Sequence, residues 1–159
     1  MRRSGLQLLL SLCLVLASVG PLGAQSSGDV VVLAHSDVPV QTLSLVELRH
    51  LVLGDRGIWP SGVRVTLIIN APGAHERAVI LNKVCQMTDA QFQQHWIAKV
   101  FRADTVTKPR IVESTAAAAD LVARTPGAIA FVDASNGGKD VKVVKVNGLS
   151  PGESAYPLR

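Results

Sequence analysis

The chain has 159 residues, of which 48% are hydrophobic and 18% charged, and its formal net charge is +4. Without residues 1–24, which include Arg2 and Arg3, the charge falls by two to +2, too little to indicate a polyanionic partner. The other Lys and Arg residues are scattered without interleaved aromatics, which argues against nucleic-acid binding. About 135 residues then remain, enough for one hydrophobic core and short for two domains.

An export signal is predicted over residues 1–24. Two arginines precede an apolar run at 6–19, which a Gly-Pro pair ends. Because a membrane-spanning helix needs about 20 apolar residues, this pattern predicts a cleaved signal peptide and not an anchor. We expect a domain of residues 25–159 that begins near Gln25, is periplasmic or secreted, and is not embedded in the membrane.

The first half of the exported domain is predicted to hold two strands around a short helix. Residues 30–34 are apolar at every position, which is typical of a strand covered on both faces. Ser44 and Glu47 have the spacing of a capping box. They start a helix that Gly54 ends, and a second strand is predicted at 63–69.

The second half is predicted to alternate helices with strands. One helix follows the turn at 70–73, and its apolar stripe is Ala78, Leu81, Val84 and Cys85. Thr88 and Gln91 form a second capping pair. The remaining expected elements are a helix from Ser114 to Arg124, strands at 128–132 and 141–146, and a turn at 136–138. This alternation predicts a layered α/β fold with a mixed, mostly parallel sheet and flanking helices.

Histidine, cysteine and aromatic residues can take part in metal binding, catalysis or ligand stacking, but here the sequence favours a structural role for them. The histidines lack zinc-site spacing, so we expect no metal: His35, His50, His75 and His95. Cys85 is expected to be a small buried group without a disulfide partner. Phe92 and Trp96 are expected to pack in the core and not to stack on a ligand. No acyl-transfer or glycosidase motif occurs, so we expect a protein that is not an enzyme and has no cofactor.

The segment 68–77 is the main candidate site. It runs from a strand through a glycine turn into a helix, and such a junction points free backbone N–H groups and the positive helix end beyond the strand. Small anions bind readily at this kind of junction. The candidate ligand-binding residues are Asn70, Gly73, Ala74, His75 and Glu76 here, with Ser36, Ser114 and Thr115 at other loop ends.

Three segments resemble the phosphate-type periplasmic substrate-binding proteins of ABC transporters. They are 43–54 (LSLVELRHLVLG) with Trp59 in the next loop, 123–132 (ARTPGAIAFV), and 147–158. The Thr-Pro-Gly unit of the second segment is the most specific. The resemblance implies a single three-layer lobe of the periplasmic-binding-protein type over residues 30–159, whereas family members normally close two lobes on an anion.

The resemblance also implies that the anion site has changed. The family pattern R-x-x-G-S-G-T, laid without gaps on this sequence, keeps Gly73 but replaces the arginine by Asn70 and the last three residues by Ala74, His75 and Glu76. Each lost charge-assisted hydrogen bond is worth about 1.5–3 kcal/mol. We therefore expect weak or assembly-dependent binding of phosphate or another small anion. The alternative is an accessory or sensory scaffold that has lost ligand binding and contacts a membrane transporter or a sensor protein.

Overall fold

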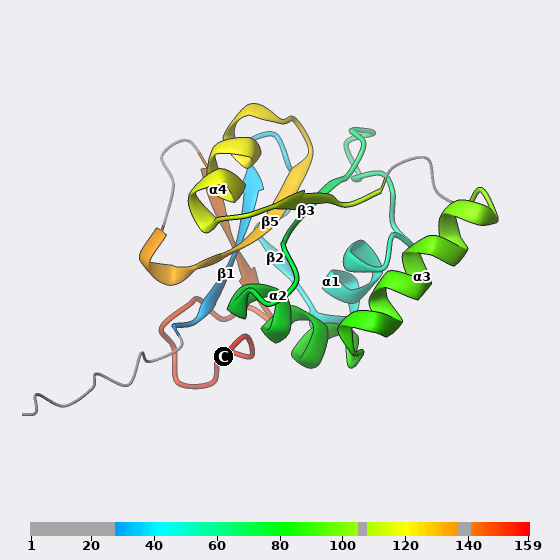
Figure 1. Cartoon of the computed structure of the whole chain (residues 1–159). Coiled ribbons are helices and arrows are strands. Elements are labelled where there is room, and N and C mark those ends of the chain that lie inside the picture. Colours follow the sequence, from blue (N-terminus) through cyan, green and yellow to red (C-terminus); the bar gives the residue numbers. More distant parts are fainter. Residues whose placement is uncertain (1–27, 105–107, 137–140) are drawn as a thin grey trace, which may run out of the picture.

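Six strands form one mixed sheet in the order β2-β6-β1-β5-β3-β4 (Figure 1). The computed structural model describes residues 28–104, 108–136 and 141–159. The strands are β1 (Val30–His35), β2 (Thr42–Leu43), β3 (Thr66–Asn70), β4 (Arg110–Val112), β5 (Ala128–Asp133) and β6 (Val141–Val146). Five strands run in one direction, and β1, between β6 and β5, alone runs in the other. The mixed, mostly parallel sheet predicted from the sequence is confirmed.

Helices cover both faces of the sheet, so the fold has three layers. They are α1 (Leu45–Val52), α2 (His75–Val79) with its π-helical continuation η1 (Ile80–Cys85), α3 (Asp89–Phe101), α4 (Thr115–Arg124) and the 3-10 turn η2 (Ala134–Asn136). In Figure 1, α4 lies on one side of the sheet, while α1, α2 and α3 lie on the other. The side chains of β1 alternate accordingly: Val30 and Val32 join the larger core, and Val31 and Leu33 join the smaller core beneath α4.

Both predicted capping boxes are present. Ser44 N–H donates to Glu47 Oε2 at 2.8 Å, and Glu47 N–H donates to Ser44 Oγ at 3.2 Å. Thr88 and Gln91 form the same pair of bonds at 2.8 and 3.2 Å. Ser114 caps α4 by accepting a backbone N–H at 3.1 Å. Because each cap joins residues three apart, the helix starts follow directly from the local sequence.

The Thr-Pro-Gly unit joins the two halves of the chain. Gly127 has a φ of +72°, a conformation that strongly favours glycine. Its carbonyl accepts from the buried Trp59 Nε1 at 2.9 Å and from Thr66 N–H at 3.1 Å. Its own N–H donates to Asp37 Oδ1 at 3.0 Å. The loop tryptophan and the Thr-Pro-Gly unit, which carry much of the sequence resemblance, are therefore in direct contact.

The side chains expected in the core are buried. Cys85 is 0% exposed, and burial raises the pKa of its thiol to about 11. Phe92 and Trp96 are 3% and 9% exposed and meet edge to face, with ring centroids 6.4 Å apart. Cys85 is free of disulfide bonding in the described part of the chain. The burial expected of these three residues is confirmed.

Several expectations from the sequence differ from the structure. Ala78 is exposed, because the helix turns Val79 and Ile80 inward where it widens into η1. β3 begins at Thr66 and not at residue 63. The two short strands β2 and β4 were not predicted, since each is no more than three residues long and pairs only with a distant segment.

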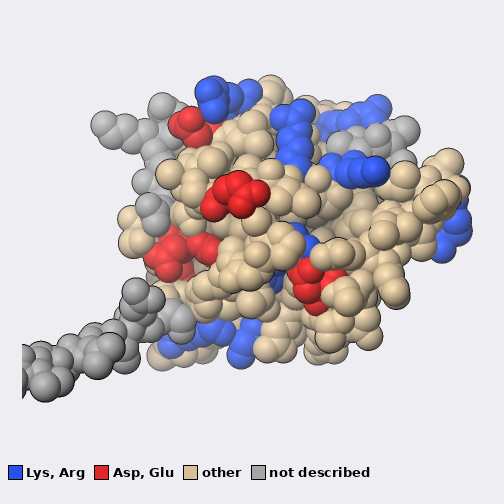
Figure 2. Space-filling model, in the orientation of Figure 1, with Lys and Arg blue, Asp and Glu red and all other residues tan. Residues whose placement is uncertain are grey.

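Some predictions fall outside the described residues. These are the signal peptide over residues 1–24, the mature start near Gln25, and positions 137 and 138 of the predicted turn. Within the ranges described, no helix is long and apolar enough to cross a membrane. On the face shown in Figure 2, Lys and Arg residues alternate with Asp and Glu residues among wide uncharged areas.

Candidate functional site

The carboxyl ends of β3, β4 and β5 meet at one edge of the sheet because these strands are parallel. Ligands of open α/β sheets bind at such edges. Asn70 ends β3, Ser114 and Thr115 follow β4, and Asp133 ends β5. Ala71 N–H donates to Val112 O at 2.9 Å, which ties the loop after β3 to the end of β4. The structure thus brings the 70–76 junction and the start of α4 together, as a shared site would require.

The junction at residues 70–76 has open space around its backbone but few side-chain hydrogen-bond donors. Asn70 is 2% exposed, and its Oδ1 has no hydrogen-bond partner in the described part of the molecule. Gly73 has a φ of +91° and open space around it. Ala74 stands at the N-cap of α2 and makes no side-chain cap. The junction therefore has the backbone of a strand–turn–helix turn, and Asn70, Gly73 and Ala74 contribute no cationic or hydroxyl side chain to it.

Glu76 places a buried carboxylate in the first turn of α2 and engages the hydroxyl of Thr115. It is 8% exposed, and Thr115 Oγ1 donates to its Oε1 at 2.5 Å. This contact joins the first turn of α2 to the first turn of α4. A carboxylate in that position satisfies the positive field of the helix start and repels a second anion.

A second carboxylate lies at the end of β5. The Ser135 hydroxyl and N–H both donate to Asp133 Oδ1, at 2.6 and 2.9 Å, and these hydrogen bonds hold the pKa of Asp133 below its ordinary value. The charge of the exposed His75 also lowers the pKa of Asp133, to a smaller extent. The strand-end edge therefore carries negative charge at neutral pH.

Ser36 lies apart from the other candidate residues. It follows β1, whose direction is opposite to that of β5: Ala34 pairs with Ile129 near the start of β5. The neighbouring Asp37 contacts Gly127, which precedes β5. The reversal of β1 thus places Ser36 at the end of the sheet opposite Asn70, and the sequence pattern of a strand does not reveal its direction.

Arg77 was not among the candidates. It is 3% exposed, its Nε donates to Asp89 Oδ1 at 2.6 Å, and its Nη1 donates to Asn70 O at 3.1 Å. A signal in the sequence could have found it, because Arg77, Leu81 and Val84 share one helical stripe. A charged residue on an apolar stripe predicts a buried, paired cation.

Solved phosphate receptors have a fold similar to the one described here. A Clostridium perfringens protein with bound phosphate shares 18% identity at a TM-score of 0.63, over 78% of this chain and 47% of that one. An ABC-type phosphate transport receptor from Vibrio cholerae shares 15% sequence identity at a TM-score of 0.63, and the match covers 78% of this chain and 48% of the receptor. PstS from Borrelia burgdorferi shares 11% sequence identity at a TM-score of 0.67, and the match covers 82% of this chain and 54% of PstS.

No protein-family model matches the sequence, and no curated protein matches it. The chain spans about half the length of the receptors it matches in structure. Those neighbours are binding proteins, as their descriptions state. At these identities the similarity shows the fold alone, which is the three-layer lobe of the periplasmic-binding-protein type.

Proposed function

We propose that the chain is an exported, non-catalytic binding module that holds phosphate or another small anion weakly, or only when a second protein surface completes the site. The similarity to phosphate receptors and the strand–turn–helix junction at residues 70–76 support binding at this edge. A membrane transporter or a sensor protein is the kind of partner that such a module would serve in the periplasm.

The contact between Glu76 and Thr115 carries this proposal. It fills the start of α2 with a buried carboxylate and engages the hydroxyl of Thr115, at 2.5 Å. An incoming phosphate would have to displace this carboxylate or lie beside it, with repulsion from Asp133 as well. Backbone donors alone then remain, which favours weak binding or a requirement for donors from a partner.

Isothermal titration of the purified protein with phosphate tests the proposal. We expect no signal at micromolar phosphate and weak binding at millimolar phosphate. Glu76→Gln removes the charge and keeps an acceptor for Thr115, so it should tighten phosphate binding about tenfold. Glu113→Gln is the matched control, since Glu113 is an exposed carboxylate near the same strand ends, and it should change the affinity far less. Micromolar affinity in the parent protein would show that the proposal is wrong.

The negative charge of the edge also favours a second function, a protein-interaction scaffold that no longer binds a ligand. Asp133 would then be a contact residue for a basic surface, with the exposed His75 beside it, while the buried Glu76 would add negative charge behind them. Absence of phosphate binding in both the parent and Glu76→Gln, together with a periplasmic partner lost in His75→Ala, would favour the scaffold. His75→Ala should leave the fold intact because the side chain is exposed.

A further inference from the structure

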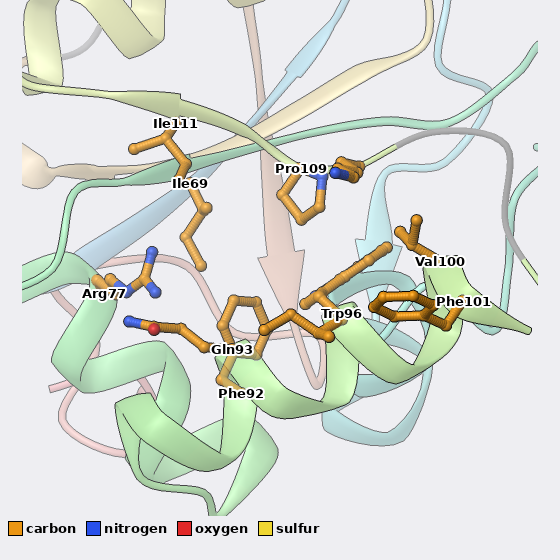
Figure 3. A pocket seen from close by; sticks show the side chains of 11 residues that line it. Ile69, Arg77, Phe92, Gln93, Trp96, Val100, Phe101, Pro109 and Ile111 are labelled. Atoms are coloured by element: carbon orange, nitrogen blue, oxygen red, sulfur yellow. The ribbon is translucent and has the colours of Figure 1, made fainter.

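A cavity of about 390 Å³ lies between α3 and the edge of the sheet (Figure 3). Ile69 of β3 and Ile111 of β4 are paired in register and contribute its strand side. Phe92 and Trp96 of α3 contribute the opposite side. Small-molecule sites in proteins have volumes of about 300–1,000 Å³ and mostly apolar linings with a few polar groups. The cavity fits that description.

One buried cation lies at one end of the cavity. The guanidinium of Arg77 is fixed by its bonds to Asp89 Oδ1 and Asn70 O, and it lies 5.3 Å from the ring centroid of Phe92. A guanidinium has five N–H donors. In the described part of the chain, Arg77 Nη2 donates to no acceptor, and Figure 3 shows the guanidinium directed toward the cavity.

The lining has positive charge and donors but no carboxylate. Its charged members are Arg77 and Lys108, and none of its residues is Asp or Glu. Asp89 neutralises part of the charge of Arg77, but its side chain is 38% exposed and also accepts from Gln93 Nε2 at 2.6 Å. A negatively charged group that only accepts hydrogen bonds would satisfy this lining.

The apolar surface selects among anions. Phosphate is strongly hydrated, and burying it against Ile69, Phe92 and Trp96 would remove its water without enough replacement donors. A carboxylate can accept hydrogen bonds from a single guanidinium. An alkyl or aryl body would cover the apolar walls, and each buried CH₂ favours binding about fourfold. The lining therefore fits an organic acid better than an inorganic anion.

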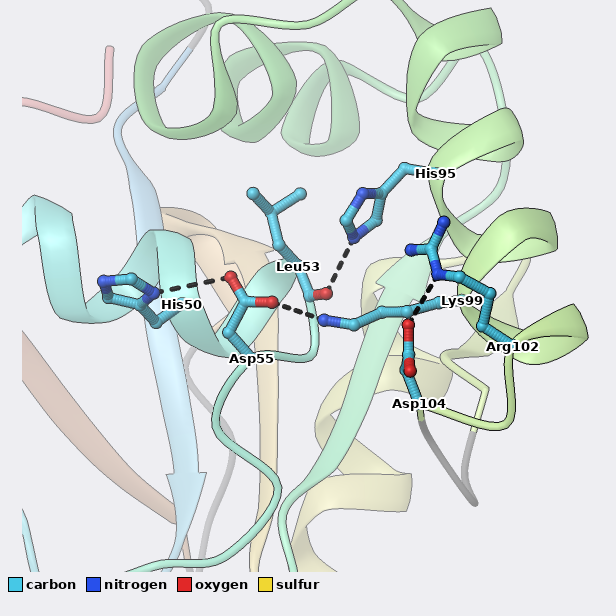
Figure 4. Close-up of polar contacts among 7 residues, drawn as sticks. All are labelled: His50, Leu53, Asp55, His95, Lys99, Arg102 and Asp104. Atoms are coloured by element: carbon cyan, nitrogen blue, oxygen red, sulfur yellow. Dashed lines mark hydrogen bonds and ion pairs between the residues drawn. The ribbon is translucent and has the colours of Figure 1, made fainter.

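Contacts on the other side of α3 fix the position of this helix, and with it one wall of the cavity, before any ligand binds. Lys99, which is 7% exposed, pairs with Asp55 (Figure 4). His95 Nε2 donates to Leu53 O at 2.9 Å. These contacts fasten α3 to the loop after α1, so the side that carries Trp96 is positioned without a ligand. A preformed site loses less conformational entropy on binding.

We infer that this cavity binds a small organic acid, with its carboxylate on Arg77 Nη2 and its alkyl or aryl body between Ile111 and Trp96. The site goes beyond the function proposed above, because it lies beside α3 and does not use the Glu76–Thr115 contact. The two proposals can therefore fail separately.

A ligand series tests the chemistry by isothermal titration of the purified protein. Octanoate and 4-phenylbutyrate should bind, and octanol, which has the same chain without the charge, should bind at least about tenfold more weakly than octanoate. Acetate, which has the charge without the chain, should give no signal. Equal affinity for octanol and octanoate, or no binding of either acid at millimolar concentration, would overturn the inference. Excess phosphate should not displace octanoate, and displacement would show that the two sites are one.

Variants at exposed positions test the location without threatening the fold. Ile111 is 59% exposed and lines the cavity, while Val143 on β6 is 47% exposed and does not. Ile111→Glu should weaken octanoate at least about tenfold, and Val143→Glu should change it by less than about twofold. Ile111→Lys should not weaken octanoate. Arg77→Lys keeps the charge but loses the forked donors, so octanoate should weaken while octanol does not. Equal effects of Ile111→Glu and Val143→Glu would refute the location even if Arg77→Lys fails to fold.

Discussion

Gly127→Ala should destabilise the fold by about 2–5 kcal/mol, much more than the same change at Gly62. Both glycines have positive φ, +72° and +83°, and an L-residue in the left-handed region costs about 1–2 kcal/mol. At Gly62 nothing lies within 4 Å of the added Cβ. At Gly127 the Cβ would lie 2.2 Å from Arg64 O, so the backbone of one segment has to move.

That movement would affect the hydrogen bond from Trp59. Its buried Nε1 donates to Gly127 O at 2.9 Å, and leaving such a donor unsatisfied costs about 1–3 kcal/mol. The strain and the lost bond together give the range expected for Gly127→Ala, while Gly62→Ala should lose only about 1–2 kcal/mol.

Urea unfolding followed by circular dichroism measures both variants, with unchanged m-values as the check that the denatured states are comparable. Tryptophan fluorescence of native Gly127→Ala should also shift, because the partner of Trp59 moves. Equal losses of stability in the two variants would refute the close approach as the cause. A Gly127→Ala protein as stable as the parent would refute the conformational argument as well.

Three further predictions concern processing, redox chemistry and pH. Mass spectrometry of the exported protein should find an N-terminus near Gln25, and an intact Met1 would contradict the predicted signal peptide. Reducing agent should leave the melting temperature unchanged, and Cys85 should react with a thiol reagent at pH 8 only after denaturation, because burial raises its pKa to about 11. Partial burial raises the pKa of Asp55, but the hydrogen bond and charge of Lys99 outweigh it and lower the pKa overall. A lowered folded-state pKa gives stability that is present above the unfolded value and is lost as pH falls through the folded value. Because the Asp55 side chain is 44% exposed, solvent screens this pair, so Asp55→Asn should cost about 0.5–1 kcal/mol at pH 7. The change should also flatten the loss of stability below about pH 4, and an unchanged acid profile would contradict the role of the Lys99 pair.

Features that depend on neighbours in sequence could be predicted. Two helix starts are predicted by capping boxes, because the partners of each hydrogen bond are only three residues apart: Ser44 with Glu47, and Thr88 with Gln91. The run at 30–34 is apolar at every position, so this local pattern alone indicates a strand that is buried on both faces. Burial of Cys85 also follows from its place on a helical stripe.

Features that depend on distant pairing could not be predicted from local patterns. The direction of β1 is set by its neighbours β5 and β6, and it decides that Ser36 lies away from Asn70. β4 has three residues, and only its pairing with β3 makes it a strand. The cavity beside α3 exists because Ile69 and Ile111 come from segments some forty residues apart in the chain. A helical stripe identifies Phe92 and Trp96 as apolar but does not show what they face.

The position of one guanidinium accounts for the different anions that we propose for the strand-end junction and for the cavity. In the resemblance to phosphate receptors the arginine stands where this chain has Asn70. Here Arg77 donates to the Asn70 carbonyl at 3.1 Å from the following helix, and its remaining donors face the apolar cavity. An arginine restored at position 70 would enter a place that is 2% exposed beside this existing cation, and two like charges 4 Å apart repel by about 4 kcal/mol at an effective dielectric of 20. Asn70→Arg alone should therefore recover phosphate binding poorly, because Asp89 offsets only part of the charge of Arg77, and removing the charge of Arg77 would remove the cation that favours an organic acid in the cavity.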